Sequence, residues 1–351
     1  MAEQAEESSA LSKEIPYPPS WVDRFIIWID RLPGPVWLFY VLSVLVFALL
    51  INATFWIDGS LPIGSIYPTG AGFAFFVFYW LGLYQYLTRV GSRSLQTFRP
   101  LLEAEDHEIR RIEYELNVLP GWLGWLALPL AFAFAAASIL GDPAPYEDIV
   151  PRTAVPYVGD IVTTGFLVAT FYCLIIRSIR QLRMVRKLHA RATHINLLKL
   201  QPAHAFSALT ARTGIGIFLL LVATLPLDPT PFSSTLDLLT TAAALLLAIA
   251  AFVLPVMGIR GQIEEEKRRV LDETSDLLHV ASGRLHSHIR GDSYQNIRDT
   301  KDAIEALIRE RELVKRIPTW PWDPGTLRGF ASALLLPIFL WLVTRLLEEF
   351  F

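Results

Sequence analysis

The stretch VWLFYVLSVLVFALLINATFWI, residues 36–57, contains no charged side chain. A helix that crosses a bilayer needs about 20 predominantly apolar residues, so this stretch predicts a transmembrane helix. The composition agrees, because 53% of the 351 residues are hydrophobic and 19% are charged, whereas soluble domains contain about 45–50% and about 25%. The sequence therefore indicates an all-α membrane protein and argues against a soluble enzyme.

Six other segments have a similar length and composition. They are 66–87, 122–140, 158–177, 213–227, 236–258 and 327–347. We therefore expect a polytopic protein with seven transmembrane helices, of which six lie in the region 36–258 and the seventh at 327–347. The segment 213–227 is the shortest, and if it is a core helix the protein has six spans.

Lys and Arg are concentrated in three loops and nearly absent from the three loops that alternate with them. The basic loops are 89–121, 177–212 and 258–326. The alternating loops are 58–65, 141–157 and 228–235, and their only Lys or Arg residue is Arg152. Because Lys and Arg accumulate in cytoplasmic loops, this pattern predicts a cytoplasmic N-terminus and an external C-terminus. An odd number of spans also places the two ends on opposite sides.

The residues before the first span divide into two parts. Residues 1–19 are acidic and polar, contain no apolar signal-peptide core, and are predicted to be a disordered tail. Residues 20–33 are predicted to form a helix that Ser20 caps and a Pro-Gly-Pro sequence ends. Its apolar side and its position beside a span indicate a helix lying in the membrane interface. The alternative is an amphipathic helix packed on its own protein.

Three predicted cytoplasmic segments are too long to be simple connections. They are 89–121, 178–211 and 259–318. The last has apolar residues at helical spacing on both sides of Gly291, and charge pairs at i,i+4 such as Glu264 and Arg268, so it predicts an αα-hairpin. Its apolar stripe needs a partner, which is either the other helix of the hairpin or a second copy of the chain, and we expect a homo-oligomer that assembles through these helices.

A basic face is predicted on the helix that leaves the fourth span. Its residues are Arg177, Arg180, Arg183, Arg186, Lys187 and Arg191. A voltage-sensing role is disfavoured, because the first three spans contain no acidic partner at membrane depth. We expect contact with the anionic lipids of the bilayer or with a partner, and we hypothesise that the acidic residues of 89–121 pair with this stretch.

The sequence contains none of the motifs that mark common enzyme classes. It has no phosphate-binding glycine loop, HExxH or nucleophile elbow. His286 and His288 are two residues apart, so their side chains point in different directions on a helix and do not predict a metal site. We therefore expect a protein that is not an enzyme, with no cofactor, no metal and no nucleic-acid partner.

The predicted external side is acidic and includes Asp237, Glu348 and Glu349. Such residues form a mouth that concentrates cations over a pore, although acids are also simply tolerated on that side. The first hypothesis is therefore an oligomeric cation-channel-like protein. One alternative is a non-enzymatic sensor or scaffold that acts through its cytoplasmic helices. A second is a transporter or lipid-handling protein, although no inverted repeat or mid-membrane ionisable residue supports it.

Two resemblances bear on these hypotheses. The stretches IPTWPWDPGTLRGFASALLLPIFLWL (317–342) and HAFSALTARTGIG (204–216) resemble sequences of uncharacterised bacterial multi-pass membrane proteins. That resemblance implies a multi-pass protein of the bacterial plasma membrane and brings no activity. In topology alone, the chain is similar to the seven-helix odorant and gustatory receptor channels of insects. That likeness implies a tetramer in which the seventh span lines a pore.

Overall fold

The computed structural model describes residues 16–141, 151–191, 204–224, 257–290 and 294–319, together with positions 149, 197, 202, 246, 249, 325, 327–329, 331, 332 and 335. In this part of the chain all regular structure is helical, apart from one isolated bridge between Pro19 and Pro120. The all-α prediction is therefore confirmed. Most of the predicted tail, 1–19, lies outside the described residues.

Three of the described helices are long and apolar enough to cross a membrane. They are α3 (Val36–Asp58), α6 (Gly121–Gly141) and α7 (Val155–Ala190), with mean hydropathies of 2.4, 2.0 and 1.8. They coincide with the first, third and fourth predicted spans. The side chains of Leu45, Val46 and Leu49 on α3 are more than half exposed, which suits a helix that faces lipid.

The other four predicted spans are not established. The second, 66–87, forms the first part of α4 (Pro68–Phe98), which is rich in aromatic residues and glycine and therefore less apolar. The fifth, 213–227, overlaps α8 (Ser207–Thr224). The sixth and seventh, 236–258 and 327–347, fall almost entirely outside the described residues. The count of seven spans and the orientation remain predictions.

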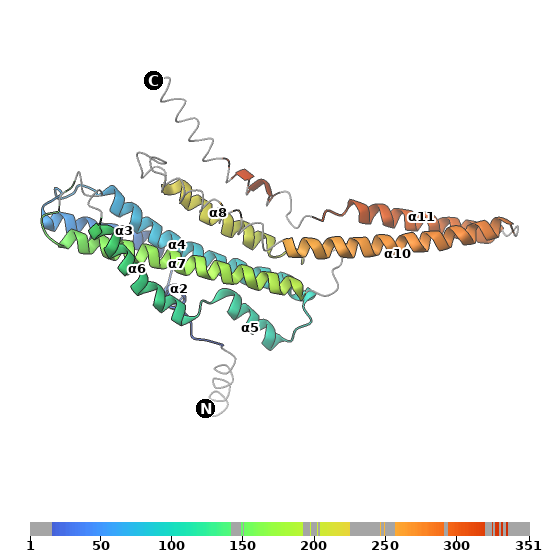
Figure 1. Cartoon of the computed structure of the whole chain (residues 1–351), viewed down its shortest axis with the longest axis horizontal. Helices are drawn as coiled ribbons and strands as arrows, with labels where there is room; N and C mark the ends of the chain where they lie inside the picture. The colour runs from blue at the N-terminus through green and yellow to red at the C-terminus, as the bar shows by residue number, and fades with distance from the viewer. Residues whose placement is uncertain are drawn as a thin grey trace, which may run out of the picture.

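Helices α3, α4, α6 and α7 lie side by side in one bundle, and α8 packs against α4 (Figure 1). Glycines permit the closest approaches. A Cβ atom on Gly165 of α7 would lie 2.9 Å from Cγ of Phe132 on α6, and one on Gly216 of α8 would lie 2.7 Å from the side chain of Leu83 on α4. Tyr79 of α4 also donates a hydrogen bond to the Gly216 carbonyl oxygen at 2.9 Å.

Helices α4 and α7 are longer than a bilayer requires. With 31 and 36 residues, they reach about 46 Å and 54 Å at 1.5 Å per residue, against a hydrocarbon core of about 30 Å. Both therefore extend beyond the apolar part of the bundle. We call this the polar end: it holds the C-terminal halves of α4 and α7, the 3-10 helix η1 (Arg99–Leu101), α2 and α5 (Asp106–Asn117).

The predicted interfacial helix is α2 (Trp21–Asp30), and Ser20 caps it as expected. The Ser20 hydroxyl accepts a hydrogen bond from the Asp23 amide at 3.2 Å, while the Asp23 carboxylate accepts one from the Ser20 amide at 3.3 Å, so the two form a capping box. Val22 is buried against the bundle, whereas Trp28 is 56% exposed. The helix thus packs on its own protein, and its position in the membrane interface remains a prediction.

The predicted hairpin is formed by α10 (Met257–Arg290) and α11 (Tyr294–Arg316), which lie side by side and project away from the bundle (Figure 1). The joining residues 291–293 lie outside the described residues. Thr274 and Val314 are buried along the hairpin. Lys267 of α10 donates hydrogen bonds to the carbonyl oxygens of Lys315 and Ile317, at 2.8 and 2.7 Å, and so satisfies the C-terminal end of α11.

We expect Gly165→Leu to separate α6 from α7, because its side chain would occupy the place of the Phe132 ring. Overpacking of this kind costs about 1–3 kcal/mol, so the melting temperature of the purified protein should fall. Gly283→Ala is the control, because a Cβ at Gly283 on α10 meets no atom within 4 Å. Equal losses of stability in the two variants would contradict the close α6–α7 contact.

Candidate functional site

Arg177 on α7 is 2% exposed and forms the centre of the polar end. Its Nε donates to the Asn117 carbonyl oxygen at 2.9 Å, one terminal nitrogen donates to the Tyr84 carbonyl oxygen at 3.1 Å, and the other donates to the Thr88 hydroxyl at 2.8 Å. Three of its donor groups therefore have acceptors on α4 and α5. A guanidinium so deeply buried is stable only with such partners, because an unpaired buried charge is very costly.

Tyr84 joins the arginine to a buried carboxylate. The guanidinium carbon of Arg177 lies 4.1 Å from the centre of the Tyr84 ring, in a cation–π contact. The hydroxyl of the same ring donates to Asp23 Oδ1 at 2.8 Å. Arg177 thus contacts the ring of Tyr84, and Asp23 accepts a hydrogen bond from its hydroxyl. The three residues connect α7, α4 and α2.

Asp23 is the other charged member of this group. Its Oδ2 accepts hydrogen bonds from the Ser20 hydroxyl at 2.6 Å and from the Leu119 amide at 3.0 Å. Burial raises the pKa of the Asp23 carboxyl above its ordinary value, while the hydrogen bonds from Ser20 and Tyr84 act in the opposite direction. The Asp23 carboxylate therefore attaches the loop between α5 and α6 to α2. We call Asp23, Tyr84 and Arg177 the buried triad.

A set of buried amide and hydroxyl groups adjoins the triad. Asn117 Oδ1, Ser178 Oγ and both amide atoms of Gln181 are buried without a hydrogen-bond partner in the described part of the chain. A Cβ atom on Gly91 of α4 would lie 2.5 Å from Asn117 Oδ1 and 2.8 Å from Gln181 Nε2. Only glycine therefore leaves room for these two amides between α4, α5 and α7.

The predicted basic face does not form one surface. Arg177 is buried in the triad, and Arg180 contacts Tyr17, with a hydrogen bond of 3.3 Å and its guanidinium carbon 5.6 Å from the ring centre. Arg183, Arg186 and Lys187 are exposed. The regular spacing of the arginines along α7 thus places them in different surroundings, because neighbouring helices cover only part of its circumference.

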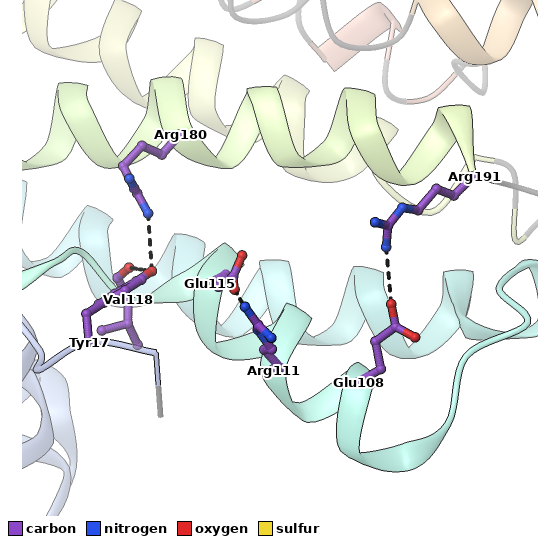
Figure 2. A network of polar contacts seen from close by, with 7 residues as sticks. All are labelled: Tyr17, Glu108, Arg111, Glu115, Val118, Arg180 and Arg191. Atoms are coloured by element: carbon purple, nitrogen blue, oxygen red, sulfur yellow. Dashed lines mark hydrogen bonds and ion pairs between the residues drawn. The ribbon is translucent and has the colours of Figure 1, made fainter. Parts of the chain in front are cut away.

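The hypothesised pairing of acidic and basic stretches is present between α5 and the end of α7. Arg191 on α7 donates to Glu108 on α5 at 3.2 Å, whereas Arg111 pairs within α5 with Glu115 at 3.0 Å (Figure 2). The side chains of Arg191 and Glu108 are 66% and 43% exposed, and exposed ion pairs contribute only about 0–1 kcal/mol. The pair orients α5 against α7 but is not a major source of stability.

The predicted acidic mouth is not tested, because Asp237, Glu348 and Glu349 lie outside the described residues. Two polar side chains of α7, Thr163 and Thr170, are buried and donate hydrogen bonds to carbonyl oxygens of their own helix. Among the described residues, no group of three His, Cys, Asp or Glu side chains is arranged to hold a metal.

Comparisons with protein-family models, with characterised proteins and with solved structures found no match to this chain. The two resemblances noted from the sequence therefore remain expectations.

Sequence reasoning missed the buried triad, although it had identified Ser20 as a cap and Arg177 as basic. The only local signal is Asp23, which stands three residues after Ser20 and completes a capping box. Tyr84 carries no comparable signal, because it lies among many other aromatic residues of α4.

We expect Arg177→Lys to destabilise the protein by about 3 kcal/mol, because an ammonium group cannot reach three acceptors held in the plane of a guanidinium. The melting temperature in detergent measures the loss. The matched control is Arg183→Lys on the exposed side of the same helix, with an expected change within about 0.5 kcal/mol. If the two variants have the same melting temperature, the buried guanidinium does not stabilise the polar end.

Proposed function

We propose that this protein is a multi-pass membrane scaffold that self-associates through the α10–α11 hairpin. The observation that supports this most directly is the exposure of large apolar side chains on a hairpin that projects from the bundle. Leu277, Val280 and Leu313 are 50%, 51% and 61% exposed. Single exposed apolar residues are common on any protein, but Leu277 and Val280 are neighbours on one face of α10.

The buried triad supports the same proposal from the other side. It fixes α2, α4, α5 and α7 to one another, so the bundle provides a rigid base for a projecting segment. A scaffold needs these two parts, an anchored base and an interaction surface that extends beyond it. With the orientation predicted from the basic loops, the hairpin faces the cytoplasm.

We infer that the occupant of the exposed face is a second copy of the chain. The hairpin carries both acids and bases, including the ion pair of Lys301 with Glu305 at 3.6 Å, and such mixed charge allows antiparallel self-pairing without net repulsion. A recess of about 830 Å³ also lies along α11, with Val270, Ala306 and Leu313 in its lining. The charged residues Glu266, Asp302, Glu305, Arg309 and Glu310 share the lining, so the recess offers both apolar surface and ion-pair partners to a second helix.

The cation-channel hypothesis stays a second proposal, supported by the sequence alone. It shares the oligomer but also needs a conducting path with Glu348 and Glu349 at its mouth. Reconstituted liposomes separate the two functions: a channel predicts a cation flux that falls in the Glu348→Gln/Glu349→Gln double variant. A scaffold predicts no flux from a fully assembled protein.

We expect the double substitution Leu277→Glu/Val280→Glu to dissociate the oligomer, because it places two carboxylates in an apolar contact. Light scattering of the full chain in detergent should give a mass that is a multiple of 39.5 kDa for the native protein and the single value for the variant. His279→Glu is the matched control, since it adds a carboxylate at an exposed position between the two. A monomeric native protein, or an unchanged mass in the variant, would contradict self-association.

A further inference from the structure

We propose that the groove between α3 and α4 binds the acyl chain of an anionic phospholipid, whose phosphate is held by Arg212 of α8. The groove has a volume of about 580 Å³, which is within the range of ligand sites. Its lining includes Trp37, Val41, Leu45, Phe75, Gly82 and Tyr86. The inference is independent of the hairpin and of the scaffold proposal.

The length of the groove favours an acyl chain over a transmembrane helix as its occupant. From Trp37 to Leu45 on α3, and from Phe75 to Tyr86 on α4, the lining extends about 12 Å and about 16 Å at 1.5 Å per residue. One leaflet accounts for about half of the roughly 30 Å hydrocarbon core. An acyl chain matches that depth, whereas a transmembrane helix of a second copy requires a contact along the full core.

The two ends of the groove differ in polarity, as a lipid site requires. Trp37, Tyr40 and Tyr86 line the end nearest α2, and the Tyr40 hydroxyl donates to Gln85 Oε1 at 3.0 Å. Aromatic side chains with a polar atom are favoured at the level of the headgroups. Leu45 lies toward the other end and carries no polar group, so an acyl chain enters the groove from the polar end.

Arg212 supplies a cation at the same end. Its guanidinium carbon lies 5.6 Å from the centre of the Tyr86 ring, and α8 is held there by the contact of Gly216 with Leu83 and Tyr79. Arg212 is exposed and has no carboxylate within ion-pair distance in the described part of the chain. A guanidinium pairs well with phosphate oxygens, and a basic residue at the membrane surface favours anionic lipid.

Gly82 gives a direct way to block the groove. A Cβ atom there would meet only the Tyr40 Cε2 atom, at 4.0 Å, so a larger side chain extends into the groove without a backbone clash. Gly82→Leu should therefore fill the site and leave the fold intact. Gly82→Ala is the matched control, because a single methyl group leaves most of the groove open.

The experiment reconstitutes the full chain in vesicles of equal parts palmitoyl-oleoyl phosphatidylglycerol and phosphatidylcholine, extracts it in mild detergent, and counts retained lipids by native mass spectrometry. We expect one retained phosphatidylglycerol on the native protein and on Gly82→Ala. Gly82→Leu should retain about tenfold less, since each displaced CH₂ group weakens binding. Arg212→Gln should lower the preference for phosphatidylglycerol about fivefold and keep a bound phospholipid.

Two results would overturn the placement of the acyl chain in the groove. One is equal retention by Gly82→Leu and the native protein, which would place the lipid elsewhere. The other is a disulfide-linked dimer of the Leu45→Cys variant in membranes, which would show a second copy in the groove. The native Cys173 is buried, so a crosslink reports on the introduced thiol. An unchanged lipid preference in Arg212→Gln would overturn the placement of the headgroup.

Discussion

The buried guanidinium of Arg177 is the constraint on which the polar end depends. Its acceptor on α5 is the carbonyl oxygen of Asn117, the last residue of that helix, so the arginine occupies the place of a C-terminal cap. Its acceptors on α4 are the Tyr84 carbonyl oxygen and the Thr88 hydroxyl, and that hydroxyl itself donates to the same carbonyl oxygen at 2.9 Å. Each of these groups has a fixed position in its helix. The arginine therefore determines how α4, α5 and α7 meet.

A second polar group surrounds the same end and marks where the apolar part of the bundle stops. Asp30 at the end of α2 accepts hydrogen bonds from Gln85 at 2.7 Å and from Arg89 at 2.8 Å, and Gln85 accepts one from Tyr40. Charged side chains are costly in the hydrocarbon core. We therefore expect the boundary of the membrane at the level of Asp30 and Arg89, next to the buried triad and to the exposed Trp28.

The sequence predicts the elements of this fold better than it predicts their contacts. Local composition and spacing specify one helix in the uncharged stretch 36–57 and a pair of helices in 259–318, and all three are present. The surroundings of Arg177 follow from no local pattern, because its partners lie 60 and 93 residues away and two of them are backbone carbonyl oxygens. Every residue has a backbone carbonyl oxygen, so the sequence does not show which of them accepts a hydrogen bond. Equal spacing along α7 therefore made a buried arginine and an exposed one look the same.

The value of the buried triad lies in specificity rather than in net stability. Burying a guanidinium and a carboxylate costs several kcal/mol per charge, which well-placed partners do little more than offset. In an alternative packing of the helices the two charges would lack these partners, so the cost of burying them would not be offset. If α7 shifted by one turn, about 5.4 Å, Arg177 would lose its acceptors on Asn117 and Thr88. Ordinary apolar packing between α4 and α7 would tolerate such a shift far better. The arginine therefore selects one arrangement of the helices, as the scaffold function that we propose would require.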